Sequence, residues 1–139
     1  RDKNGQQIGG WMPIDQFPAT VSNTGDSDAK LTAEGQASGL FDVPNKVNLN
    51  ALTLDDNFAN LHKEYIILAE RADNKESAAI RLPFGKGSYV EVCIDARSTF
   101  PAAEGLLENG LAYFARLNVG QAVEPGGKLA TTWGKIKSE

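Results

Sequence analysis

Few side chains in this sequence are suited to nucleophilic or acid–base chemistry, because it contains one histidine and one cysteine. A cysteine or serine nucleophile needs a neighbouring base, and His62 is the sole imidazole that would serve. His62 follows a predicted helix and stands beside Lys63 and Glu64, a context typical of a solvated surface histidine. Cys93 lies in an alternating apolar pattern, where a cysteine acts as a small core residue. We therefore expect no catalytic residue and a non-enzymatic protein.

Residues suited to metal binding are equally sparse. One histidine and one cysteine do not make a four-coordinate zinc site without carboxylate ligands. Residues 23–28 gather oxygen ligands in a predicted turn, and Glu34 stands at the twelfth position counted from Asn23, as in a calcium-binding loop. Asp28, however, takes the sixth position, where that loop requires glycine. We favour an ordinary loop rich in Asp and Asn and predict no metal and no cofactor, with calcium as the alternative.

The patterns that would bind phosphates or nucleic acids are weak. Residues 85–87 (Gly-Lys-Gly) lack the glycine spacing of a phosphate-binding loop and are expected to form a hairpin turn. Basic and aromatic residues gather only at Arg81, Phe84, Lys86 and Tyr89. The net charge of -4 argues against a protein that binds by neutralising phosphates, so no nucleic-acid partner is expected.

The composition is that of a single small globular domain. The chain has 139 residues, of which 41% are hydrophobic and 23% charged, and this length buries a sizeable core without disulfides. The lone cysteine excludes an internal disulfide framework. The nearest apolar window, Tyr65 to Ala69, is far too short to span a bilayer, so no membrane partner is expected.

Apolar patterns predict six or seven strands and no internal repeat. Residues 65–69 are expected to form the core strand, because their continuous apolar run is typical of a strand buried on both faces. Other strands are predicted by short alternating or apolar runs at residues 39–43, 78–82, 89–94 and 111–117, with a glycine-rich turn at 83–87. The alternation resumes at 47–49, and a last segment at 128–136 is set off by the turn residues 124–127. These elements indicate a mainly β fold, a small single-domain β-barrel or sandwich with one or two short helices.

Two segments show helical signals. Leu54, Phe58 and Leu61 recur at helical spacing within Thr53 to His62, and Thr53 is suited to cap the first turn. Residues 101–109 favour a helical turn or two, which Asn109-Gly110 would stop.

Residues 1–30 are rich in Gly, Pro and polar side chains and are expected to form an extended arm or long loop before a single β-rich domain at 31–139. This range carries four large apolar residues, Trp11, Met12, Ile14 and Phe17. A free tail has no physical reason to hold them in water, so they must dock on a surface. Two interpretations stay open, namely the core of this domain and another subunit. We take the four as the candidate interface residues.

Two segments resemble a known family of small β-rich proteins. Residues 119–130, from Val119 through Glu124-Pro125-Gly126-Gly127 to Ala130, resemble a turn and strand of the head decoration (cement) proteins of tailed bacteriophages. Residues 39–44, a predicted strand that ends in Val-Pro, are similar to a second segment of these proteins. The resemblance implies a virion protein without enzymatic activity that binds the outside of an icosahedral capsid, often as a trimer, and bridges its subunits.

We therefore expect a structural protein that binds and stabilises a viral capsid or a similar assembly. Its partners would be protein subunits, and it would itself be a homo-oligomer, a trimer if the resemblance holds. An arm that becomes ordered on binding is able to wrap a large surface, which suits this role. The alternative is an extracellular module for carbohydrate or another small ligand, in which Trp11, Tyr89 or Trp133 would stack on sugar rings.

Overall fold

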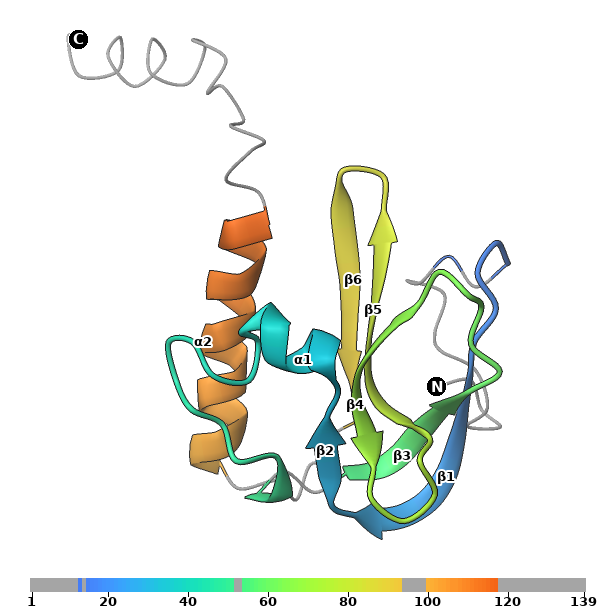
Figure 1. Ribbon diagram of the computed structural model, residues 1–139, viewed down its shortest axis with the longest axis horizontal. Helices are drawn as coiled ribbons and strands as arrows, with labels where there is room; N and C mark the ends of the chain where they lie inside the picture. The colour runs from blue at the N-terminus through green and yellow to red at the C-terminus, as the bar shows by residue number, and fades with distance from the viewer. Residues whose placement is uncertain (1–12, 14, 52–53, 94–99, 118–139) are drawn as a thin grey trace, which may run out of the picture.

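Six strands form one antiparallel sheet (Figure 1). The computed structural model describes residues 13, 15–51, 54–93 and 100–117, and only the backbone of 23, 24, 54, 55, 100 and 101. The strands are β1 (Thr20–Ser27), β2 (Ala29–Leu31), β3 (Leu54–Ala59), β4 (Ile66–Arg71), β5 (Ser77–Phe84) and β6 (Gly87–Val92). The expectation of a mainly β fold is confirmed.

The sheet curls because one continuous, bent segment of the chain forms both β1 and β2, which are the two end strands of the sheet. The strand order is β1-β3-β5-β4-β2, with β6 paired to β5, and only Asp28 separates β1 from β2 in the chain. A bulge bends β1, where the register with β3 shifts between Asn23 and Ser27 and Gly25 takes a φ of 77°. β3 meets β5 at the single pair Phe58–Ser77. The end strands β1 and β2 are not paired with each other in the described part of the chain, so the curled sheet does not close into a barrel.

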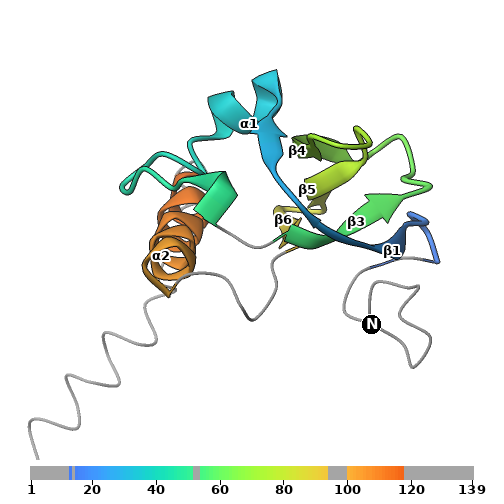
Figure 2. The same ribbon diagram turned by 90° about the horizontal axis from the view of Figure 1, so that it is seen from below.

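Two helices and a 3-10 helix accompany the sheet. They are α1 (Ala33–Ser38), η1 (Leu49–Ala51) and α2 (Phe100–Leu117), and both α-helices lie on one side of the sheet (Figures 1 and 2). The expected helices were short, whereas α2 has 18 residues.

Each side of the sheet has its own apolar core. The helix-side core lies between the sheet on one side and helix α2 with the loop that follows α1 on the other. It comprises Ala29, Leu40, Phe41, Val47, Leu49, Leu68, Ala69, Ala78, Ala79, Leu106 and Tyr113. We call the side of the sheet that faces away from α1 and α2 the strand side, and the core on it the strand-side core. It comprises Ala19, Val21, Phe58, Tyr65, Ile80 and Leu82. The sheet is therefore covered on both sides, as the continuous apolar run of β4 predicts.

The strands predicted at 65–69 and 78–82 are confirmed as β4 and β5. The turn predicted at 83–87 joins β5 to β6, whose strand begins at Gly87. Val90 and Val92 pack on the helix-side core, while Tyr89 and Cys93 pack on the strand-side core. The predicted alternation of β6 is thus confirmed, although both of its faces, and not one, contact apolar residues.

The helix predicted at 53–62 is wrong, because Leu54–Ala59 forms β3. Its apolar residues fit a strand as well as a helix, since Phe58 enters the strand-side core. The side chain of Asn57 is fully buried and donates a hydrogen bond to Glu76. Pairing with β1 over several residues therefore outweighs the local helical signal.

The strand predicted at 39–43 is also wrong, because these residues form a turn after α1. Gly39 ends that helix with a φ of 67°, and its N–H donates to the carbonyl of Gln36. Leu40 and Phe41 are both buried in the helix-side core, so two successive apolar residues face inward and the alternation of a strand is lost.

The helical stop at Asn109-Gly110 and the strand at 111–117 are both replaced by α2, which runs through to Leu117. Leu106 and Tyr113 are buried on the side of α2 that faces the sheet. Asn109 is fully buried between them and bonds to the loop after α1. Tertiary contacts on this side of the helix override the local stop signal.

The extended arm predicted for 1–30 does not extend to residue 30, because β1 begins at Thr20. β1 pairs with β3 from Thr20–Ala59 onward, and β2 pairs with β4 from Ala29–Arg71 to Leu31–Ala69. β1 has the sequence Thr-Val-Ser-Asn-Thr-Gly-Asp-Ser, in which Val21 is the one large apolar residue, so it lacks the apolar alternation that predicts a strand.

A close approach of α1 to β4 fixes the helix on the sheet. Thr32 caps the helix, since its Oγ1 accepts from the N–H of Gly35 at 3.0 Å and donates to the carbonyl of Ile67 at 2.6 Å. A Cβ on Gly35 would stand 1.8 Å from the carbonyl oxygen of Leu68. Only glycine therefore allows this contact.

We expect Gly35→Ala to destabilise the protein by about 3 kcal/mol or more, because the methyl group must push α1 away from β4. Urea unfolding with linear extrapolation measures this change. Gln36→Ala, at the neighbouring exposed position, should change the free energy of unfolding by less than about 0.5 kcal/mol. Equal effects of the two substitutions would show that the close approach is not the constraint.

A buried arginine ties the strands together where the sheet curls. The guanidinium of Arg71 is fully buried and donates to the carbonyls of Gly25 at 2.8 Å and Asp56 at 3.4 Å. It also forms two hydrogen bonds of 3.1 and 3.0 Å with the carboxylate of Asp73. One cation thus joins the bulge of β1, strand β3 and the β4–β5 turn. The bidentate pair neutralises the buried charge.

This pair should make folding stability depend on pH in acid. The hydrogen bonds from Arg71 are the largest cause that lowers the pKa of Asp73, from 3.8 to about 2. A carboxyl group whose pKa is lower in the folded state contributes its stabilisation fully above about pH 4 and loses it as the pH falls through about 2.

We expect Asp73→Asn to lower stability at pH 7 and to flatten the fall in stability between pH 4 and pH 2, measured by urea unfolding at each pH. Asp42→Asn, which removes an exposed carboxylate from the loop after α1, controls for the loss of one negative charge. An acid dependence as steep in Asp73→Asn as in the parent would refute the role of the pair.

Candidate protein-binding surface

Four rings gather at one end of the strand side of the sheet, and we call Phe17, His62, Phe84 and Tyr89 the aromatic surface. The Phe17 ring meets the ring of His62 edge-on, with centroids 5.4 Å apart, and that of Phe84 at 6.0 Å. Phe84 and Tyr89 are 5.8 Å apart. Edge-to-face contacts at these distances are favourable beyond the area they bury. The four rings therefore form one continuous group.

Backbone hydrogen bonds hold Phe17 in this place. The hydroxyl of buried Tyr65 donates to the carbonyl of Phe17 at 3.0 Å, and the N–H of His62 donates to the carbonyl of Pro18 at 2.9 Å. A turn precedes them, in which the N–H of Phe17 donates to the carbonyl of Pro13 at 2.9 Å. Burial raises the pKa of the Tyr65 phenol, so the hydroxyl remains a hydrogen-bond donor further into alkaline pH than an exposed tyrosine does.

The β5–β6 hairpin carries Phe84 outward. Phe84 pairs with Gly87 at the end of the ladder, and Gly85 adopts a φ of 57° in the turn between them. The hairpin extends beyond β4 and β2 in Figure 1. Phe84 is 40% exposed, and the neighbouring Lys86 is exposed as well. The tip thus presents an aromatic ring to the surroundings beside a positive charge.

Of the four candidate interface residues, Phe17 lies within the described part of the chain. It is half-buried, packs against the strand-side core and touches exposed Phe84. Trp11, Met12 and Ile14 lie outside the described residues, so their role as an interface stays a prediction. Phe84 was noticed in the sequence only as part of a basic and aromatic group, and its contact with Phe17 had no local signal.

That basic and aromatic group is divided between the two sides of the sheet. Phe84 and Tyr89 belong to the aromatic surface, whereas Arg81 donates a hydrogen bond of 2.7 Å to the hydroxyl of Tyr113 on α2. Arg81 pairs with Val90 across the strands and so faces the helix side. The four residues therefore do not form one surface.

The single histidine and the single cysteine, His62 and Cys93, are both half-buried on the strand side of the sheet. His62 is half-buried against the Phe17 ring, which differs from the solvated position expected from its charged neighbours. Cys93 is half-buried and packs on the strand-side core, as its alternating pattern predicts. On that side, burial raises the pKa of the Glu91 carboxyl, which pairs with Ile80 in the ladder.

Residues 23–28, the alternative calcium loop, belong largely to β1. The carbonyl of Gly25 is bound by Arg71, and the carbonyl of Asp28 accepts from the N–H of Ala72 at 2.8 Å. Among the residues that the structure describes, no group of three or more His, Cys, Asp or Glu is placed to hold a metal ion.

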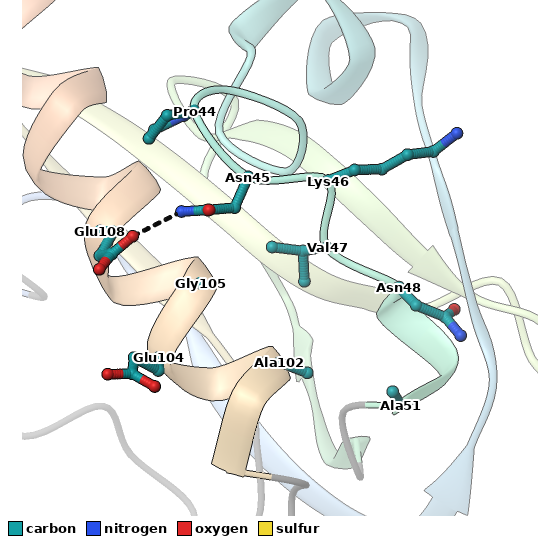
Figure 3. A pocket seen from close by; sticks show the side chains of 10 residues that line it. All are labelled: Pro44, Asn45, Lys46, Val47, Asn48, Ala51, Ala102, Glu104, Gly105 and Glu108. Carbon is teal, nitrogen blue, oxygen red and sulfur yellow. Dashed lines mark hydrogen bonds between the residues drawn. The ribbon is translucent and has the colours of Figure 1, made fainter.

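A groove lies on the other side of the sheet, between α2 and the loop at residues 44–51 (Figure 3). It has a volume of about 740 Å³ and is widely open to the surroundings. Its polar residues are Asn45, Lys46 and Asn48 on the loop with Glu104 and Glu108 on α2. Figure 3 shows Asn45 pointing toward Glu108, while Lys46 and Asn48 extend away from the helix. The polar groups therefore do not converge on one point.

Asn109 fixes the wall of this groove. Its side-chain carbonyl accepts from the N–H of Asn45 at 2.8 Å, and its amide donates to the carbonyl of Asn45 at 2.7 Å. The amide of Asn45 in turn donates to Glu108 at 2.7 Å. A buried asparagine thus pairs with both backbone groups of one loop residue, as a neighbouring strand would.

We expect Asn109→Ala to destabilise the protein by about 2 kcal/mol, because it leaves the backbone groups of Asn45 without these bonds. Thermal or urea unfolding measures the loss. Glu108→Gln keeps an acceptor for the Asn45 amide and should cost less than about 0.5 kcal/mol. If Asn109→Ala is as stable as the parent, the loop is held by something else.

The chain was compared with family models, with curated proteins and with solved structures, and none of the three comparisons gives a match.

No helix of the described residues combines the length and apolar character needed to cross a membrane.

Proposed function

We propose that this protein is a structural component of a larger assembly, in the manner of a capsid decoration protein, and that the aromatic surface is where it contacts protein subunits. The observation that carries the proposal is the contact between Phe17 and Phe84, in which the second ring is 40% exposed. This contact places the exposed ring of Phe84 beside Phe17, which follows the other three candidate interface residues, Trp11, Met12 and Ile14, in the sequence.

The chemistry of these residues suits a protein interface. Aromatic side chains and Met are enriched at interface cores, and a few such residues supply most of the binding energy. Phe84 and Tyr89 stand on a two-stranded hairpin, and the backbone before β1 is fixed by Tyr65 and His62. A surface held in place in this way loses little conformational entropy on binding. The resemblance of residues 119–130 to decoration proteins, a segment outside the described residues, supports a virion as the location and a homotrimer as the form. Residues 39–44 do not add to this support, because they form a turn and not the strand on which their resemblance rested.

A module that binds carbohydrate or another small ligand is the second candidate, and the groove between α2 and residues 44–51 favours it. Amide and carboxylate side chains at its rim are suited to hydroxyl groups. Lys46 and Asn48 extend away from the helix, so the polar groups do not meet around one ligand (Figure 3). We therefore prefer the assembly protein.

Native mass spectrometry at a series of protein concentrations tests the proposal. We expect a defined homo-oligomer, a trimer, without a bound small molecule. Phe84→Ser should raise the concentration at which half of the chains associate by about tenfold or more, since a central aromatic contact costs over about 1.4 kcal/mol when lost. Trp11→Ala should act in the same direction.

Val43→Ser is the matched control, because Val43 is 46% exposed but follows α1 on the helix side of the sheet. It should leave association unchanged. A monomer at every concentration, or an equal loss with Val43→Ser, would contradict the proposal. A monomer that carries a sugar-sized adduct would support the second candidate.

A further inference from the structure

The outer face of α2, defined as Glu104, Leu107, Glu108, Leu111 and Ala115, is exposed along its length. Leu107 and Leu111 stand one turn apart and are 68% and 69% exposed. Glu104 and Glu108 flank them toward the start of the helix. The structure therefore shows an apolar strip bordered by negative charge.

A glycine on this helix is unexplained by the described residues. A Cβ on Gly105 would stand 3.4 Å from the Cβ of Asn45, so the loop at Asn45 lies in van der Waals contact with this position. At Gly110, one turn after Leu107 at the edge of the outer face, a Cβ would meet no described atom within 4 Å apart from the backbone of α2 and the neighbouring residues in the chain. Glycine within a helix costs about 1 kcal/mol relative to alanine, and a close neighbour on the outer face would explain it.

The sequence after α2 contains a segment of complementary chemistry. Residues 128–137 (Lys-Leu-Ala-Thr-Thr-Trp-Gly-Lys-Ile-Lys) hold three lysines and no acidic residue. The same segment contains three large apolar residues, Leu129, Trp133 and Ile136. Residues 128–137 thus combine apolar and positively charged side chains, which complement the leucines and glutamates on the outer face of α2.

The connection between the two allows an antiparallel arrangement. Ten residues separate Leu117 from residue 128 and include Pro125-Gly126, an order typical of a tight turn. Ten residues span at most about 35 Å, whereas Leu111 lies about 9 Å along the axis from the end of α2. A segment that returns along α2 brings Lys135 and Lys137 toward Glu104 and Glu108.

We propose that residues 128–137 of this chain dock on the outer face of α2, with Trp133 over Leu107, Gly110 and Leu111. The same chain is the occupant because its connection is long enough and its charges match. A strip of two leucines is also small beside the roughly 800 Å² that each partner contributes to a standard protein interface. This docking does not depend on the proposed function, because the aromatic surface lies on the other side of the sheet.

Fluorescence of Trp133 tests the docking in the full chain. The chain has two tryptophans, so Trp11→Phe leaves Trp133 as the single reporter. In that background we expect Leu111→Lys to shift the emission to longer wavelength and to increase quenching by acrylamide. Val43→Lys, an equal charge change at another exposed apolar residue, should change neither.

A charge exchange tests the same contact without altering an apolar residue. Glu104→Lys should increase quenching of Trp133, and adding Lys135→Glu and Lys137→Glu should restore the parent value. Emission that is insensitive to Leu111→Lys and to the charge exchange would overturn the docking, as would emission that changes on dilution, which would mean a second copy. Phe84→Ser should leave the emission unchanged, which separates this result from the test of the proposed function.

Discussion

The buried guanidinium of Arg71 is the interaction on which the rest of this structure depends. It binds the Gly25 carbonyl in the bulge of β1, the Asp56 carbonyl of β3 and the Asp73 carboxylate in the β4–β5 turn. A buried cation is stable only when its donors are satisfied, and this one is satisfied by groups from three separate segments. The guanidinium thus holds these segments together at the bulge where β1 bends and the sheet curls. The sheet separates the strand-side core from the helix-side core.

The two sides of the sheet consequently have different surfaces. On the strand side, the chain before β1 is held by Tyr65 and His62, which brings Phe17 against the projecting tip of the β5–β6 hairpin. On the helix side, Asn109 holds the loop at Asn45, and α2 keeps its other face exposed. The first surface presents aromatic rings, whereas the second presents leucines beside carboxylates. We propose separate roles for them, contact with other subunits for the first and docking of the chain's own segment for the second.

The sequence predicted the elements whose signal is local. β4, β5, β6 and the glycine-rich turn carry continuous or alternating apolar residues, which any strand at that place would need. β1 was predicted as part of an arm and β3 as part of a helix, because the groups that hold them are distant in the sequence. Glu76 binds the side chain of Asn57 in β3, and Arg71 binds the backbone carbonyl of Gly25 in β1. The length of α2 was missed for the same reason, since Asn109 reads as a stop signal until its bonds to Asn45, 64 residues away, are known. For the candidate surface, Phe17 was identified by its apolar character in a polar segment, whereas its neighbour Phe84 was fixed only by the fold.

Hydrogen–deuterium exchange of the protein at low and high concentration tests most directly whether the aromatic surface is the contact between subunits. The account predicts that association protects the backbone amides at the hairpin tip, residues 84–89, and in the segment around Phe17. Amides in the loop at residues 45–51 and on α2 should exchange at the same rate in both conditions. Protection confined to that loop and α2, with an unchanged hairpin tip, would contradict the account and assign the contact to the helix side of the sheet.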